Sequence, residues 1–191
     1  MSEETSRPKS SFYDDFESPD FYDIDRLLTE EHILVRSAMR DFVKQEITPF
    51  IEEWAQNSTF PKTIVKKFGD IGAFGPFIPA KYGGGDMDYV SYGLIMQEIE
   101  RGDSGMRSTA SVQGSLVMYP IYKYGSEAQK EKYLPKLASG ELLGCFGLTE
   151  PDFGSNPAGM KSRIVDKGDH YILNGSKMWI SNAPEADIAI V

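Results

Sequence analysis

The hydrophobic pattern of this chain changes its period once, near Leu142, and that change constrains the fold more than any other feature. Before it, apolar residues such as Val35 and Met39 recur at the spacing of one helical face. After it, short runs rich in β-branched and aromatic residues alternate with turns: LLGCFGL, SRIVD, HYIL, SKMWIS and DIAIV. The pattern predicts an α+β chain, with an all-α domain over residues 26–142 and the first strands of an antiparallel β domain over residues 143–191.

Start and stop signals divide the helical part into segments. Residues 1–25 are polar and have no period, which predicts a flexible arm. Asp88 can cap one helix, and Ser126 with Gln129 has the spacing of a capping box that opens another. The expected helices are residues 29–49, a short one after Pro61, residues 88–101 and 104–118, one from residue 126, and a last short one that restarts at Pro135 and ends at Gly140.

Hairpins are expected to build the β part. Asn174-Gly175, between HYIL and SKMWIS, is a strong hairpin signal, and DKGD is a turn between SRIVD and HYIL. The last apolar run, Ile188 to Val191, has no following strand to pair with, and an open sheet edge exposes unpaired backbone groups. We therefore expect the chain to be the N-terminal part of a longer protein.

Composition argues against several classes of function. The 191 residues include 20 basic and 29 acidic side chains, and the net charge of −9 disfavours a nucleic-acid partner. No apolar run approaches the ~20 residues that a membrane span needs, and the polar N-terminus lacks the apolar core of a signal peptide. One cysteine, Cys145, and two separated histidines cannot assemble a zinc-type cluster. The sequence predicts a soluble, cytoplasmic protein without a metal site.

Common nucleotide and hydrolase motifs are absent. No GxGxxG follows a predicted strand, and KYGGGD lacks the GK[ST] of a P-loop. No G-x-S-x-G elbow is present. Cys145 lies in an apolar run and is expected to be inert core, while His32 and His170 have no partner that the sequence identifies.

The stretch GLTEPDFGSNPAG, residues 147–159, is the first candidate site. Thr149 and Ser155 offer hydroxyls, and Gly154 lets a ligand approach the backbone. Two prolines stiffen the loop and pre-position its donors. Such a loop can hydrogen-bond a flat heteroaromatic ring or a pyrophosphate. The alternative is a strand-crossover loop that its own side chains cap.

Two further stretches carry candidate chemistry. In KMWISN, Trp179 and Ser181 lie two apart and would share one side of a strand, where they could stack on a ring and hydrogen-bond its edge; the alternative is a core tryptophan. In GDSGMRSTASVQGS, Arg107 and Ser111 lie four apart on one helical face, with Glu100 before them. That cluster could bind a carboxylate; the alternative is a surface Glu–Arg ion pair.

Taken together, these stretches resemble a known family. FGLTEPDFGSNPAG followed by NGSKMWISNAP resembles the flavin-binding signatures of the acyl-CoA dehydrogenases. The longer stretch ERGDSGMRSTASVQGSLVMYPIYKYGSEAQKEKYLPKLASGELLGCFGLTEP is similar to the glutaryl-CoA branch of that family. The resemblance covers the chain after residue 25. It implies an N-terminal helical domain, a middle β domain and a C-terminal helical bundle that this chain lacks, assembled as homotetramers.

The resemblance also implies roles for particular residues. FAD would be held by the loop after the first strand and by the tryptophan stretch, with the tryptophan against the isoalloxazine and Ser181 near N5. Ser155 would lie where the FAD pyrophosphate and the CoA thioester chain meet. The implied cofactor-binding residues are Phe146, Gly147, Leu148, Thr149, Gly154, Ser155, Trp179, Ile180 and Ser181. The implied substrate-binding residues are Glu100, Arg107, Ser108, Ser111 and Ser155.

The implied reaction is FAD-dependent α,β-dehydrogenation of an acyl-CoA, most closely glutaryl-CoA, with decarboxylation to crotonyl-CoA and electrons passed to an electron-transferring flavoprotein. The base belongs to the bundle, so no residue here is assigned a catalytic role, and this chain alone is expected to be inactive. Asp152-Phe153 and Asn156 depart from the family pattern. The alternatives are an acyl-CoA dehydrogenase with another short- or branched-chain acyl specificity, or a non-catalytic helical interaction module.

Overall fold

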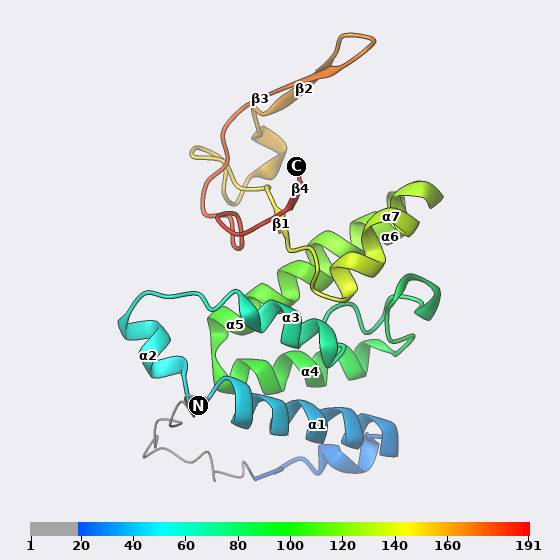
Figure 1. Cartoon of the computed structure of the whole chain (residues 1–191), viewed down its shortest axis with the longest axis vertical. Coiled ribbons are helices and arrows are strands. Elements are labelled where there is room, and N and C mark those ends of the chain that lie inside the picture. The colour runs from blue at the N-terminus through cyan, green and yellow to red at the C-terminus, as the bar shows by residue number, and fades with distance from the viewer. Residues whose placement is uncertain (1–18) are drawn as a thin grey trace, which may run out of the picture.

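A computed structural model describes residues 19–191, with a helical layer below a smaller group of strands (Figure 1). The helical elements are η1 (Ile24–Leu27), α1 (Glu30–Glu46), α2 (Ile51–Gln56), α3 (Thr63–Asp70), η2 (Ala80–Tyr82), α4 (Tyr89–Gly102), α5 (Ser104–Ser111), π-helical η3 (Val112–Met118), α6 (Tyr119–Tyr124), α7 (Glu127–Ala138) and η4 (Pro157–Gly159). The strands are β1 (Gly144–Phe146), β2 (Arg163–Asp166), β3 (Tyr171–Asn174) and β4 (Ile188–Ile190). Most of the expected arm lies outside the described residues.

Side-chain caps explain where the helices begin. Ser126 and Gln129 form the predicted capping box of α7, and Asp88 accepts from the backbone of Ser91 at the start of α4. At α1, the backbone N–H of Thr29 donates to His32 Nδ1, which leaves Nε2 of that ring to donate to Asp88 at 2.9 Å. This hydrogen bond ties the N-termini of α1 and α4 together.

Two helical boundaries differ from the prediction. Pro135 does not restart a helix, because it lies inside the continuous α7. A proline there leaves the carbonyl of Glu131 without its usual donor, and Glu131 is exposed, so water can supply one. The chain after Pro49 also forms α2, a helix that the sequence pattern did not indicate.

The helical core is continuous and contains closely approaching helix ends. Phe68 packs against Phe42 and Phe74 with ring centroids 5.6 and 5.7 Å apart. A Cβ on Gly69 would lie 2.2 Å from the backbone of Ser139, so α3 and α7 can meet only because that position is glycine. The largest fully buried apolar side chains are Phe68, Phe74, Ile47, Ile64, Ile78, Ile99, Met118, Leu134, Leu137 and Leu143.

The predicted helix over residues 104–118 is present but changes its winding. It runs as α5 and then as the π-helical segment η3, and α6 follows directly. Pro120, near the start of α6, has no N–H to donate to the preceding turn. A wider turn before a proline is one way in which a helix accommodates the missing hydrogen bond.

Gln113, in the π-helical segment, joins the helical layer to the first strand. Its side chain is fully buried. Its amide nitrogen donates to the carbonyls of Leu137 at 2.9 Å and Leu142 at 2.8 Å, and its oxygen accepts from the Gly144 N–H at 2.8 Å. One side chain therefore provides hydrogen-bond partners for a carbonyl at the end of α7, a carbonyl in the segment between α7 and β1, and the first N–H of β1.

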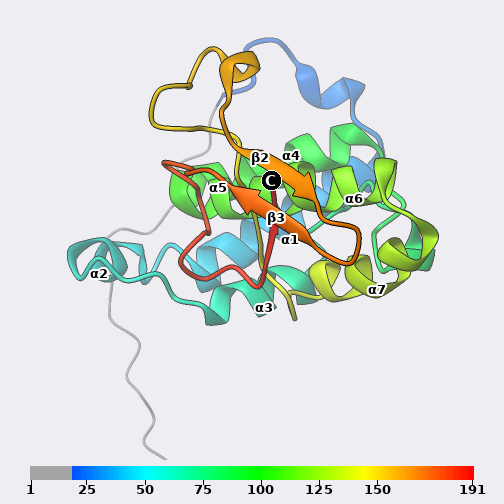
Figure 2. The same cartoon turned by 90° about the horizontal axis from the view of Figure 1, so that it is seen from above.

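The strands form two separate pairs, which corrects the antiparallel prediction in part. β2 and β3 form the expected antiparallel hairpin across DKGD, with Ile164 opposite Leu173. β1 and β4 pair in parallel, with Cys145 opposite Ala189, so the last apolar run does have a partner. Asn174-Gly175 turns no hairpin, and residues 176–181 are not a strand. Figure 2 shows the hairpin lying over the helical layer.

We expect Gln113→Leu to lower the free energy of unfolding by about 3 kcal/mol or more, because two carbonyls and one N–H lose their buried partner. Urea denaturation followed by circular dichroism measures the change. Gln97→Leu is the control: Gln97 is exposed, and its replacement should change stability by no more than about 0.5 kcal/mol. Equal effects of the two replacements would show that the Gln113 amide does not hold β1.

Candidate functional site

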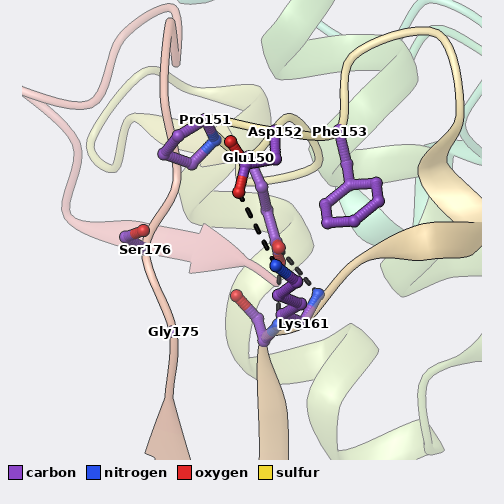
Figure 3. Close-up of a pocket in the computed structure, with 8 residues that line it drawn as sticks. Glu150, Pro151, Asp152, Phe153, Lys161, Gly175 and Ser176 are labelled. Carbon is purple, nitrogen blue, oxygen red and sulfur yellow. Dashed lines mark hydrogen bonds and ion pairs between the residues drawn. The ribbon is translucent and has the colours of Figure 1, made fainter.

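Glu150 anchors the loop that follows β1. Its carboxylate accepts from the backbone N–H groups of Lys161 at 2.7 Å and Ser162 at 2.9 Å, and from the Lys177 ammonium at 3.0 Å. Figure 3 shows the carboxylate pointing at the Lys161 backbone. Only 5% of Glu150 is exposed. The loop therefore leaves β1 and returns to the same buried carboxylate.

Hydrogen bonds hold the Glu150 carboxylate in its ionised form. The side chain and backbone of Ser162, the backbone of Lys161 and the Lys177 ammonium together lower its pKa to about 2, although burial opposes them. Sequence reasoning assigned Glu150 no role. Its place between a threonine and a proline in the quoted stretch was the only local signal, because its partners come from distant segments.

A hollow of about 300 Å³ lies beside this anchor. The ring of Phe153, which lines the hollow, packs directly on Gly159. A Cβ added at Gly159 would lie 2.2 Å from Phe153 Cε1, so the ring can take this place only beside a glycine. The Lys161 ammonium lies 5.4 Å from the centre of the Phe153 ring and 3.6 Å from Asp152. The hollow is lined by Glu150, Pro151, Asp152, Phe153, Lys161, Ser162, Gly175 and Ser176 (Figure 3).

The first part of the loop presents unused donors. Gly147 donates to Ile190 at 2.7 Å and continues the pairing with β4. The carbonyls of Leu148 and Thr149 accept from the Lys177 side chain and the Met178 N–H. Within residues 19–191, no hydrogen bond involves the Leu148 N–H or the Thr149 hydroxyl. These two groups can therefore bind a ligand without breaking a contact.

The tryptophan stretch lies beside this loop but not as predicted. Trp179 is neither on a strand nor in the core: it is 84% exposed and has a left-handed φ of 59°. A bulky residue in that region is strained and requires support from its surroundings. Ser181 is exposed and Ile180 is half-buried. The prediction that Trp179 and Ser181 share one side of a strand is therefore wrong, although both side chains are accessible to a ligand.

Gly154 and Ser155 lie on the exposed outer part of the loop, and Phe146 is half-buried in β1. The structure thus brings Phe146 to Thr149 close to the segment that carries Trp179, through the contacts of Lys177 and Met178. Ser155 makes no hydrogen bond to these residues in the part of the chain that is described.

The predicted carboxylate-binding cluster is assembled on α4 and α5. Arg107 donates through Nε to Glu100 at 2.6 Å and through Nη1 to Ser111 at 3.3 Å. Hydrogen bonds from Arg107 and Ser104 lower the pKa of the Glu100 carboxyl. The Ser111 hydroxyl also donates to the carbonyl of Ser108 at 3.1 Å. A guanidinium has five N–H donors, so Arg107 keeps further donors for a second carboxylate.

Two other classes of feature, metal clusters and membrane spans, are absent from residues 19–191. No group of three or more His, Cys, Asp or Glu side chains is placed to hold a metal ion. No helix in that range is long and apolar enough to cross a bilayer.

We expect Glu150→Gln to weaken the fold in a pH-dependent way. The folded pKa of about 2 lies below the ordinary 4.5, so the carboxylate stabilises above pH 4.5, and this contribution is lost as pH falls toward 2. The difference in unfolding temperature between wild type and Glu150→Gln should therefore shrink across that window. Calorimetry between pH 2 and 7 measures it, with the exposed Glu53→Gln as control. A constant difference would contradict the anchor.

Comparisons with known proteins show the family of this chain. The family "Acyl-CoA dehydrogenase, N-terminal domain" matches residues 29–141, and "Acyl-CoA dehydrogenase, middle domain" matches residues 145–191. Glutaryl-CoA dehydrogenase of Desulfococcus multivorans is 45% identical over 166 residues, which are 85% of this chain and 43% of that protein. The chain therefore spans less than half the length of that relative.

Solved structures give the same result. A glutaryl-CoA dehydrogenase from Mycobacterium smegmatis in complex with FADH2 superposes with a TM-score of 0.86 at 50% identity, over 88% of this chain and 43% of that one. A chain in a structure described as the electron transferring flavoprotein of Acidaminococcus fermentans has a TM-score of 0.83 at 38% identity, over 86% and 43%. Since the N-terminal domain family alone matches more than half of the sequence, this chain belongs to the acyl-CoA dehydrogenase family.

Proposed function

We propose that this chain supplies the flavin-facing loop and the carboxylate-binding cluster of an FAD-dependent acyl-CoA dehydrogenase that acts on glutaryl-CoA. One observation carries the proposal. Thr109 lies two residues from Arg107 on α5, and its carbonyl accepts from Asn182 in the segment that presents Trp179. The segment that presents Trp179 is therefore in contact with the helix that carries Arg107, which supports the proposal that the two residues serve one site.

The residues present fit a flavin. An isoalloxazine offers carbonyl and nitrogen acceptors on one edge, and the Leu148 N–H and the Thr149 hydroxyl are donors without a protein partner in the described residues. The indole of Trp179 is exposed and can pack against a flat ring. FAD, when bound, would accept the hydride from the substrate β-carbon. The part of these residues would be to bind and orient both groups.

The substrate is inferred from the arginine cluster. Arg107, Ser111 and Glu100 would hold the distal carboxylate, with Ser108 at the same end, while Ser155 would contact the thioester chain. The names of the relatives from Desulfococcus multivorans and Mycobacterium smegmatis support glutaryl-CoA. No glutamate in this chain is assigned as base. Decarboxylation to crotonyl-CoA, an electron-transferring flavoprotein as acceptor and a homotetramer remain part of the proposal.

One observation favours a second candidate, a dehydrogenase for another short or branched acyl group. The Arg107–Glu100 pair is complete without a ligand, as it would be in a surface ion pair. The comparison of two substrates below separates the candidates.

In the intact protein that carries this chain, Trp179→Ala and Thr149→Ala should each weaken FAD retention, since each removes a contact to the ring. The loss for one contact is about 1 kcal/mol, or roughly fivefold in the dissociation constant. Absorbance at the flavin band after gel filtration measures occupancy. Full occupancy and unchanged spectra in both variants would refute the assignment.

Arg107→Met should reduce activity on glutaryl-CoA far more than activity on butyryl-CoA. Leaving the distal carboxylate unpaired costs on the order of 2–4 kcal/mol, or roughly 30- to 1000-fold in kcat/KM. Arg163→Met, on the exposed strand β2, is the control and should leave both activities unchanged. Equal losses on the two substrates would show that Arg107 is structural.

A further inference from the structure

Asn182 connects the exposed segment around Trp179 to the helical layer. Its side-chain nitrogen donates to the Gly144 carbonyl at 3.1 Å and, over a longer 3.4 Å, to the Thr109 carbonyl. Gly144 is the first residue of β1. Thr109 lies on α5, the helix that directly precedes the π-helical segment. One half-buried amide thus contacts both elements that carry the candidate site.

The backbone at Asn182 explains why this residue type stands there. Its φ is 68°, in the left-handed region that asparagine tolerates better than most residues. The Glu185 N–H donates to the Asn182 carbonyl at 3.0 Å, which closes a turn. Asparagine therefore meets two requirements at once: it forms the turn, and its amide supplies two N–H donors to two carbonyls. Glycine would meet only the first, and aspartate would place acceptors against acceptors.

The position of Trp179 depends on this turn, because the exposed indole has few contacts of its own. We define the Trp179 loop as residues 179–187. At its far end Asp187 is fixed to Leu143, donating to its carbonyl at 2.7 Å and accepting from its N–H at 2.9 Å. Near its middle, Lys62 forms an exposed ion pair with Glu185. Figure 1 shows the chain descending from the hairpin toward the helices before it enters β4.

We propose that Asn182 is a positioning residue: its amide holds the Trp179 loop on β1 and α5, so that the indole stands at a fixed place relative to Arg107. The inference rests on the proposed function for the identity of the ring that Trp179 meets. The tether itself is a property of the protein without any ligand.

The first test needs no flavin. In this chain, Asn182→Gly removes the amide without imposing backbone strain, and Ser58→Gly is the matched control, because Ser58 also has a left-handed φ of 51° and is exposed. Hydrogen exchange of the amides of Ala183 and Glu185 should become about tenfold faster in Asn182→Gly. It should stay unchanged in Ser58→Gly, as should exchange in α1 and α4. Unchanged exchange in Asn182→Gly overturns the proposal.

The second test asks whether Asn182 acts through Trp179. FAD titrations of the intact apoprotein should show a dissociation constant raised about tenfold by Asn182→Gly and more by Asn182→Asp. In a Trp179→Ala background, Asn182→Gly should add little, since the positioned group is gone. Fully additive effects would overturn the positioning role. If even the unmutated apoprotein binds no FAD, the proposed function fails, and the exchange experiment still decides the tether.

Discussion

The three hydrogen bonds of the buried Gln113 amide are the contact on which the candidate site depends. β1 has three residues and a single parallel neighbour, so its own ladder cannot fix where it starts. Gln113 does so from within the helical layer, by pairing with Gly144 at one end of its amide and with the carbonyls of Leu137 and Leu142 at the other. A buried amide is costly unless all its groups are paired. Because they are, the amide gives the strand one definite position, and the loop after β1 begins from that position.

After β1, hydrogen bonds from side chains fix segments of the chain that a larger sheet would fix by backbone pairing. The Glu150 carboxylate accepts from two backbone N–H groups and one ammonium, and Asp187 exchanges two hydrogen bonds with Leu143. The Asn182 amide donates to the carbonyl of Gly144 and to a carbonyl on α5. Most of these hydrogen bonds join a side chain to the backbone of another segment. The exceptions are the Lys177 ammonium, which contacts the Glu150 carboxylate, and the Asp187 N–H, which donates to the Leu143 carbonyl. Such contacts leave the backbone of Leu148 and Thr149 partly unpaired, which is what a ligand-binding edge requires. The same arrangement explains why a short sheet can present a defined surface.

The sequence predicted what local chemistry determines and missed what distant contacts determine. Helix starts at Thr29, Asp88 and Ser126 were predictable, because a cap and its partner lie within three residues of each other. The pairing of β1 with β4 joins segments more than forty residues apart, and no periodicity in either run distinguishes parallel from antiparallel partners. Trp179 lies in a run whose composition predicts a strand, yet its backbone is left-handed, with a φ of 59°. Arg107 and Ser111 were grouped correctly because they lie four apart on one helix, whereas Glu100 contacts Arg107 across the break between α4 and α5.

The pairing of Arg107 with Glu100 also shapes how a carboxylate could enter. Before binding, the two charges balance, so a second carboxylate is attracted by free N–H donors more than by net charge. Once it arrives, two carboxylates share one guanidinium. Each would then disfavour ionisation of the other, which is opposite to the effect of Arg107 and Ser104, whose hydrogen bonds lower the pKa of the Glu100 carboxyl. Under the proposed function, the carboxylate-binding cluster would select by geometry. A distal carboxylate that fell short of the free donors would be repelled by Glu100 without forming the hydrogen bonds that offset the repulsion.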